Sequence, residues 1–389
     1  MLERGFTRLR CDSCKREHLL AFSCKSLICP SCGARRMAQT AAHLVDSVFP
    51  EVPVRQWILT PPSERTGLLA ARGEVLSKMC RIFAEEIFRS LKSASGFERE
   101  MKCGAVTFIQ RFTKTLAVYP HLHVLVPDGV FVKNGEQVIF REVVPNRAQL
   151  QSVVDRVFQR MKRLLERGGY CREESELSTL DRWYVRALEE PTLLKSVGLR
   201  SDSAVACGGF RIHAGVRVND KEGLEKLCRY AARPPFAEEQ LQIEDDRIRF
   251  ELRRPGKNGQ RTIEMTPVQF LRKLAWLVPP PRQNQIRFHG VFAGNAKWRK
   301  EIVPGSQVRL VQNPTSDELA HTVTKKFFWA ALLKRTYGFE VLDCPHCSGK
   351  LRPLAVVKEK AAIEKILKHF GLGANQTPTR RHQCVYPLP

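Results

Sequence analysis

Two closely spaced cysteine pairs near the start of the chain place the tightest constraint on its fold. Cys11 and Cys14 form one Cys-x-x-Cys pair, and after 14 further residues Cys29 and Cys32 form another. Each pair can present two thiolates from one tight turn, and two such turns complete a tetrahedral four-cysteine zinc site. The segment has little apolar core, so bound metal would supply much of its folding energy. We therefore predict a zinc ribbon whose ligands are Cys11, Cys14, Cys29 and Cys32.

The other cysteines raise two further questions about metal binding. Cys24 lies between the two pairs, and we expect it to be a bystander. The alternative to a zinc ribbon, a set of unligated buried thiols, fits poorly with so small a core. A third pair, Cys344 and Cys347, could be half of a second zinc site or a structural turn. Residues that could complete such a second site are His369, His382 and Cys384.

Length and composition favour a protein of several domains in a reducing compartment. The chain has 389 residues, 43% of them apolar, which is enough for two or three cores. Its first residues lack the apolar run of a signal peptide, and no stretch reaches the ~18 apolar residues that span a bilayer. In a reducing compartment the 13 cysteines favour metal sites over disulfides. We expect a cytoplasmic protein with no membrane partner.

The charge of the chain indicates a polyanionic partner. The net charge is +24, and residues 247–300 hold 13 Lys and Arg against 2 acidic residues. Nucleic acid is the commonest partner of so basic a protein, so we expect a nucleic-acid partner. Aromatic residues interleave with this basic block and could stack on unpaired bases, although core packing is the more common role for any one of them. They are Trp276, Phe288, Phe292 and Trp298.

The order of secondary-structure signals predicts an α+β fold. Apolar periodicity indicates helices over 34–49, 68–91, 148–167, 267–277, 316–336 and 360–370. Strand-like runs cover 57–60, 105–112, 116–126, 209–218, 247–253 and 261–265. The runs 105–112 and 116–126 are joined by a short polar turn and should form an antiparallel pair. Strands and helices do not alternate strictly, which argues against a doubly wound parallel sheet.

Two histidines one residue apart, His121 and His123, stand in an apolar strand. Side chains alternate across a strand, so both imidazoles share one face and could hold one metal ion. The alternative is a pair of hydrogen-bonded core histidines.

A single tyrosine, Tyr230, lies on a predicted basic helix about a hundred residues later. Its helical neighbours Lys226 and Arg233 make it well placed to meet a phosphate. Asn219 with Glu222 could cap the start of this helix, and Pro234 ends it. The alternative is a surface tyrosine whose ring serves as packing material.

Together these features resemble the HUH-type transposases of rolling-circle insertion sequences, the IS91 type and the related common-region elements. The resemblance covers about residues 1–350. The matching segments, in order, are Cys11 to Arg36, Val54-Arg55-Gln56-Trp57, His121-Leu122-His123 with Asp128-Gly129-Val130-Phe131, His213-Ala214-Gly215-Val216, Leu227-Cys228-Arg229-Tyr230 with Arg233-Pro234-Pro235, and Phe288-His289-Gly290-Val291 with Asn295-Ala296-Lys297.

The resemblance implies an HUH-type DNA endonuclease and strand transferase. His121 and His123 would hold Mg²⁺ or Mn²⁺ with a third polar ligand, for which Gln110 is the expected residue. Tyr230 would attack the scissile phosphate, giving a 5′-phosphotyrosine and a free 3′-OH. Two-tyrosine members carry a second tyrosine one helical turn away. Lys226 and Pro234 occupy those positions here, which is similar to the single-tyrosine branch.

The implied partner is DNA, as single strands or hairpins at the ends of an insertion sequence, and a second protomer could take part in strand exchange. The basic block would follow the phosphate backbone. The residues that we expect to contact DNA are Lys226, Arg229, Arg233, Arg253, Arg254 and Lys257.

On this basis we expect four regions: a zinc-binding ribbon at 1–48, an HUH core with an antiparallel sheet and flanking helices at 49–240, a basic mixed DNA-binding region at 241–343, and a cysteine knuckle with a tail at 344–389. Two alternative functions stay open: a plasmid replication initiator or relaxase with HUH chemistry, and an inactive zinc-ribbon DNA-binding protein.

Overall fold

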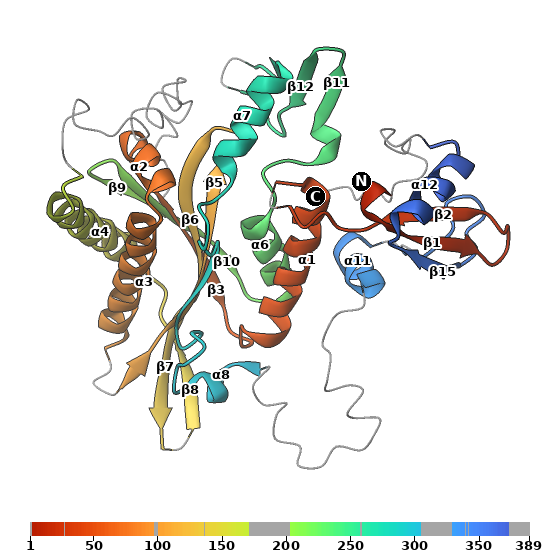
Figure 1. Ribbon diagram of the computed structural model, residues 1–389. Coiled ribbons are helices and arrows are strands. Elements are labelled where there is room, and N and C mark those ends of the chain that lie inside the picture. Colours follow the sequence, from red (N-terminus) through yellow and green to blue (C-terminus); the bar gives the residue numbers. More distant parts are fainter. Residues whose placement is uncertain are drawn as a thin grey trace. The chain divides into compact units, whose positions relative to one another are not determined.

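The computed structural model describes residues 2–26, 28–96, 100–135, 137–170, 203–256, 259–304, 329–338, 340 and 342–372. The chain divides into two compact units, which we treat separately. The cysteine unit comprises Met1–Gln39, Phe236–Glu239 and Pro314–Pro389. The sheet unit comprises Thr40–Pro235 and Gln240–Asn313 (Figure 1). The division differs from the four expected regions because segments far apart in sequence contribute strands to the same sheet.

The sheet unit is built on a six-stranded sheet in the order β14-β5-β6-β3-β10-β9, with every neighbouring pair antiparallel. The predicted pairing of the strand runs at 105–112 and 116–126 is confirmed as β5 and β6. Nearly every residue of these two strands is buried, as continuous apolar runs require. The strands are β3 (Val54–Thr60), β5 (Gly104–Phe112), β6 (Val118–Pro127), β9 (Ala204–Cys207), β10 (Phe210–Val218) and β14 (Ile286–Gly290).

Helices cover both faces of this sheet (Figure 1). On one face, α3 (Gly73–Ser95) and α4 (Arg147–Arg167) pack in a core that includes Trp57, Leu122 and Val124. On the other, α6 (Lys221–Ala232) and the second half of α1 (Pro30–Ser47) pack on the opposite side chains of the same strands. This is the α+β fold expected from the sequence, and alternation along β6 separates its two faces.

One predicted helix is interrupted. The run at 68–91 forms α2 (Thr66–Ala71) and α3 rather than one helix, because Arg72 has a non-helical ψ of 88°. No helix among the described residues is long and apolar enough to cross a membrane.

The basic segment after residue 240 is not a separate region. Its strand β14 pairs with β5. Val291, Phe292 and Trp298 lie in the same core as α6. The expected 241–343 region is therefore part of the sheet unit up to Asn313.

The other elements of the sheet unit are the 3₁₀ turns Ser63–Arg65 and Glu238–Gln240 (the latter shared with the cysteine unit), β4 (Met101–Lys102), β7 (Gly129–Asn134), β8 (Gln137–Glu142), β11 (Leu241–Glu244), β12 (Arg247–Glu251), β13 (Thr262–Met265), α7 (Pro267–Leu277) and α8 (Arg299–Ile302).

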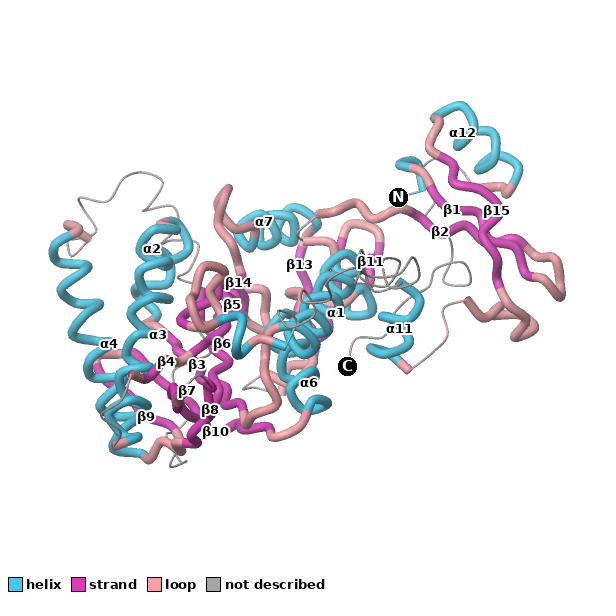
Figure 2. The backbone as a smooth tube through the Cα atoms, turned by 90° about the horizontal axis from the view of Figure 1, so that it is seen from below, coloured by secondary structure: helices cyan, strands magenta, loops and turns pink. Residues whose placement is uncertain are grey.

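The cysteine unit joins the beginning and the end of the chain. Its sheet has the order β15-β1-β2, with β1 (Phe6–Cys11), β2 (Glu17–Ala21) and β15 (Leu351–Val357) (Figure 2). The regions expected at 1–48 and 344–389 are therefore not independent. A 3₁₀ turn (Leu2–Arg4), α11 (Trp329–Tyr337) and α12 (Lys360–His369) complete the unit. Of the helix predicted at 316–336, residues 316–328 lie outside the described residues.

Candidate active site

His121 and His123 lie on β6 and share one face, as predicted. Nδ1 of His121 lies 2.8 Å from the backbone oxygen of Tyr119. A carbonyl oxygen can only accept a hydrogen bond, so Nδ1 carries the proton and donates. The other ring nitrogen, Nε2, then keeps its lone pair, which is the form of imidazole that binds a metal.

His123 is 2% exposed, and its Nε2 is buried without a hydrogen-bond partner. Its Nδ1 lies 3.0 Å from Nε2 of Gln56, a buried residue of β3. The two ends of a glutamine amide exchange by a half turn, and with the Gln56 oxygen facing the ring, Nδ1 donates and Nε2 is free for a metal. In that orientation Nε2 is a buried acceptor with no partner, which carries a desolvation penalty of about 1–3 kcal/mol that a bound cation would remove.

Gln110 supplies a second buried acceptor on the same face of the sheet. It pairs with His121 across the β5–β6 ladder, and paired residues lie on one face. Its Nε2 donates to the backbone oxygens of Tyr230 and Ala231, at 3.0 and 2.9 Å. These bonds orient the amide, and its Oε1 is buried without a partner. Among the described residues no third His, Cys, Asp or Glu joins the two histidines, so the amide oxygen is the best-placed third ligand.

Tyr230 is on α6, and its ring meets His123 edge to face with centroids 5.7 Å apart. Tyr230 is 46% exposed. Asp220 caps the helix by accepting a hydrogen bond from the backbone of Gly223, so the predicted cap at Asn219 is wrong by one residue. Proline disfavours the helical conformation of the residue before it, so the helix ends at Ala232 and Arg233, which precedes Pro234, is not helical.

The predicted DNA-contacting residues differ in their surroundings. The guanidinium of Arg233 lies 4.5 Å from the ring centroid of Tyr230, whereas Lys226 forms an exposed ion pair with Glu222. Arg229 is half-buried on α6, and Arg253 and Arg254 are exposed. Lys257 lies outside the described residues. Of the four aromatic residues in the basic block, Phe292 and Trp298 are buried, Trp276 is half-buried, and Phe288 is 38% exposed.

Burial keeps the histidines of the site neutral. Desolvation lowers the pKa of His121, and it lowers the pKa of His123 well below 6.5, with Arg233 adding a like charge near both. Neutral imidazole is the ligand form, so protons compete weakly with a metal at neutral pH.

Acid is expected to destabilise the metal-free protein in a defined pH window. Desolvation lowers the pKa of His289 to about 4, and that of His123 also falls. The unfolded chain then binds more protons than the folded one below about pH 6.5. The stability these groups provide is present above that pH and is lost as the pH falls toward the folded-state pKa. Thermal unfolding in the presence of a chelator should show a midpoint (Tm) that declines from about pH 7 to about pH 5. The decline should be shallower in His289→Asn, and a Tm that is flat or rises would contradict the expectation.

Two residues that matter here were not assigned roles from the sequence. Gln56 contacts His123, and the only sequence signal for it is an amide in an otherwise apolar strand. Asp128 is 1% exposed and forms ion pairs with Arg55 and Arg217 at 2.7 and 2.9 Å. These pairs connect β3 and β10 to the end of β6, and they brace the sheet that carries the histidines.

The predicted four-cysteine ligand set is not brought together. Cys11 and Cys14 group with Cys344 and Cys347, whereas Cys29 and Cys32 group with Cys24, the presumed bystander. The reason is the β1–β15 pairing, which carries the C-terminal pair to the first knuckle. In each group one thiol has a lowered pKa, whereas burial and neighbouring thiols raise the pKa of Cys14 to about 11 and that of Cys29 to about 12. The backbone N–H of Cys14 lowers the pKa of the Cys11 thiol to about 6 although burial opposes it. Burial also opposes ionisation of Cys32, but hydrogen bonds, first that of Ser23, bring its pKa to about 7.

Two family models match the chain. The family described as "Putative transposase" matches residues 104–300, just over half of the chain, and the family described as "Transposase zinc-binding domain" matches residues 2–61. A protein of Sinorhizobium fredii named "Putative transposase y4qJ" is 26% identical over 308 residues, covering 75% of this chain and 70% of its own length. No solved structure matches. The first matched range includes β5, β6 and α6, and thus the whole candidate site.

Proposed function

The chain belongs to the IS91-like transposase family, and from the site that it carries we propose that it cleaves and rejoins single-stranded DNA through a covalent bond to Tyr230. Membership in the family implies DNA binding and DNA strand transfer in general. The single observation that carries the finer proposal is the juxtaposition of Tyr230 with His123, whose buried Nε2 has no partner.

The chemical step follows from the exposed tyrosine. The Oη atom of Tyr230 attacks a backbone phosphorus, a new O–P bond forms, and the bond to the 3′ oxygen breaks. The phenol proton passes to water, and the leaving 3′ oxygen takes up a proton, giving a 5′-phosphotyrosine and a 3′-OH. The reverse attack by another 3′-OH restores a phosphodiester, so bond energy is conserved and no nucleotide cofactor is required. The Arg233 guanidinium lies against the tyrosine ring and is placed to offset phosphate charge.

The residues around the tyrosine fit a divalent metal. His121 and His123 would supply ring nitrogens and Gln110 an amide oxygen. Nε2 of His123 and Oε1 of Gln110 are both buried without a hydrogen-bond partner. When bound, Mg²⁺ or Mn²⁺ would polarise the scissile phosphate. The amide oxygen of Gln110 is a donor of the kind that suits Mg²⁺ and Mn²⁺.

The proposed DNA path runs over basic residues near the tyrosine. Arg229 lies on α6 and Arg233 directly follows that helix, and the exposed Arg253 and Arg254 follow β12. Phosphate contacts of this kind would make affinity strongly salt-dependent. Phe288 is the most exposed of the four aromatic residues in the basic block and could stack on a base. Binding to chromosomal DNA would associate the protein with the nucleoid.

Structural zinc accompanies this function, because residues 2–61 match a zinc-binding domain. Within that range Cys24, Cys29 and Cys32 lie with their sulfurs within 4.8 Å of one another. Three thiols are one ligand short of a closed structural site, and no His, Cys, Asp or Glu among the described residues supplies the fourth. The fit of this group is therefore partial.

Mapping the covalent bond tests the proposed function. Full-length protein is incubated with 5′- and 3′-labelled single strands from the ends of the insertion sequence in Mn²⁺, and a denaturing gel is read for a slow adduct. We expect the adduct to carry the label 3′ of the cut, and peptide mass spectrometry to place the nucleotide on Tyr230. An adduct on another residue, or cleavage of bound DNA without any adduct, would reject the proposal. Chelator should abolish the adduct and leave DNA binding in place.

A further inference from the structure

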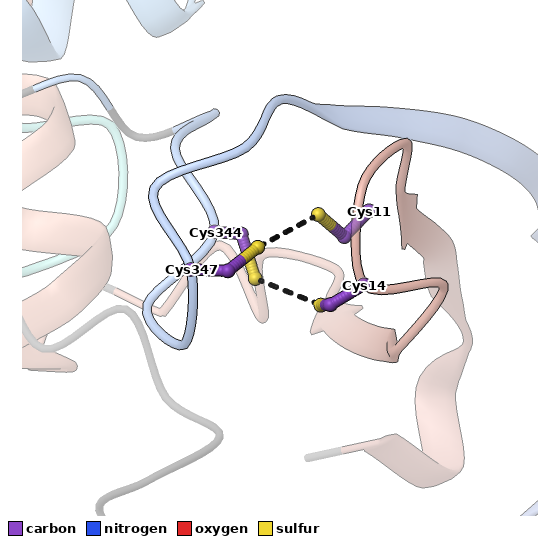
Figure 3. A group of neighbouring side chains, drawn as sticks. All are labelled: Cys11, Cys14, Cys344 and Cys347. Carbon is purple, nitrogen blue, oxygen red and sulfur yellow. Dashed lines mark hydrogen bonds between the residues drawn. The ribbon is translucent and has the colours of Figure 1, made fainter.

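The cysteine group formed by the two ends of the chain is a built metal site. Cys11 ends β1 and Cys14 follows it, and Cys344 and Cys347 precede β15 (Figure 3). The four sulfurs all lie within 4.8 Å of one another. Neither family match extends to residues 344–347.

The sulfur distances distinguish a metal site from disulfides. Sγ of Cys11 lies 3.5 Å from that of Cys347, and Sγ of Cys14 lies 3.7 Å from that of Cys344. A disulfide bond is about 2.05 Å long. A tetrahedral zinc with Zn–S bonds of about 2.3 Å has sulfurs about 3.8 Å apart along each edge. The observed pairs are close to that edge, and all four cysteines are free.

The two turns share one backbone conformation. In the first, the N–H of Cys11 donates to Arg16 and the N–H of Lys15 donates to Cys11. In the second, the N–H of Cys344 donates to Gly349 and that of Ser348 donates to Cys344, at the same spacings. Lys15 and Ser348 occupy equivalent positions and both have positive φ, 61° and 56°. Two matching knuckles that face each other supply two thiolates each.

The surroundings are shaped for four sulfurs. A Cβ atom at Gly349 would lie 3.0 Å from Sγ of Cys11 and 2.5 Å from Oγ of Ser13, so only glycine fits between the knuckles. The ring of His18 is 8% exposed, and its Nε2 lies 3.9 Å from Sγ of Cys344. A ring N–H directed at a thiolate stabilises the charge that a metal-bound sulfur carries.

From this geometry we propose that Cys11, Cys14, Cys344 and Cys347 bind one Zn²⁺ ion that joins the two ends of the chain. The four thiols release their protons to solvent as the metal binds. The apolar clusters of this unit are small. One holds Leu2, Phe6, Leu19, Val357, Ile363 and Leu367, and the other holds Leu9 and Leu351 beside Cys11 and Cys344. The ligand pairs are 330 or more positions apart in sequence, so the metal would add a cross-link to the backbone pairing of β15 with β1.

Zinc stoichiometry of the full-length protein tests this ligand set. Cys14→Ser and Cys344→Ser should each lose one zinc equivalent per chain, and the double variant should lose no more than either single one. The matched control Cys207→Ser, in β9 of the sheet unit, should keep the wild-type content. If Cys344→Ser keeps all its zinc while Cys14→Ser and Cys29→Ser lose the same equivalent, Cys11 and Cys14 bind zinc with Cys29 and Cys32, and the proposal is overturned.

A variant that retains four ligands removes the ambiguity of misfolding. In Cys347→His, an imidazole can replace the thiolate, so zinc content should stay at the wild-type value. With Co²⁺ in place of zinc, the thiolate charge-transfer absorption of this site should fall by about a quarter, as expected for three sulfurs instead of four. An unchanged cobalt spectrum in Cys347→His would show that Cys347 is not a ligand.

Discussion

Tyr230→Phe is expected to abolish the covalent protein–DNA adduct, with a loss of at least about 10³-fold, because phenylalanine retains the ring and removes the only atom that attacks. DNA affinity and folding stability should barely change. The ring of Tyr230 is 46% exposed, and its contact with Arg233 is a cation–π interaction that phenylalanine also makes. Adduct yield on a denaturing gel and binding by fluorescence anisotropy, on the same protein preparations, measure the two quantities separately.

Tyr119→Phe is the matched control. Tyr119 is close to the site, with its ring centroid 6.3 Å from that of His121, but it is buried, and its hydroxyl donates to the backbone oxygen of Pro61. Its loss should cost about 1 kcal/mol of stability and leave the adduct intact. If Tyr230→Phe still forms the adduct, or if only Tyr119→Phe loses it, the nucleophile has been assigned to the wrong residue.

His123→Ala is expected to lower the rate of adduct formation at least about 100-fold at fixed Mn²⁺, because a metal contributes several kcal/mol to stabilising charge in the transition state. His123 is central to the proposed site, between His121 and Tyr230, with ring centroids 5.0 and 5.7 Å away. The control is His43→Ala on α1, which should match wild type. Rates are measured from quenched time courses on denaturing gels.

Thermal unfolding separates metal binding from catalysis in the same variant. A metal present at about 100 times its Kd adds about 3 kcal/mol, which for a unit of this size raises Tm by roughly 5–10 °C. Wild type and His43→Ala should show this rise with Mn²⁺, and His123→Ala should not. A full Mn²⁺-dependent rise in His123→Ala would show that its Nε2 is not a ligand, whatever happens to the activity.

Local patterns in the sequence were sufficient for most elements of the sheet unit. Alternation predicted that His121 and His123 share a face, and apolar runs predicted the antiparallel pair that became β5 and β6. The helix carrying Tyr230 was predicted together with its end at Pro234. These features depend on contacts between residues near one another in sequence, so periodicity and turn chemistry are enough to predict them.

The structure differs from the expectations wherever distant segments pair. Cys11 and Cys14 were expected to join Cys29 and Cys32, the nearest pair along the chain, but β15 brings Cys344 and Cys347 to them instead. The basic segment was expected to be a region of its own, but β14 adds to the main sheet beside β5. A prediction from spacing favours partners that are close along the chain. Strands far apart in sequence can still pair, because the entropic cost of closing a loop grows only slowly with the length of the loop.

The sequence by itself therefore determined the chemical inventory of this transposase: a histidine pair on one strand face, one tyrosine on a basic helix, and cysteine knuckles suited to zinc. Only the tertiary structure decided which of these meet. It placed Tyr230 against His123, turned the Gln110 amide by bonding it to the end of α6, and divided the cysteines between two groups. The reason is physical: side-chain chemistry and local periodicity belong to short stretches of chain, whereas these encounters depend on sheet order and on the packing of helices across its faces.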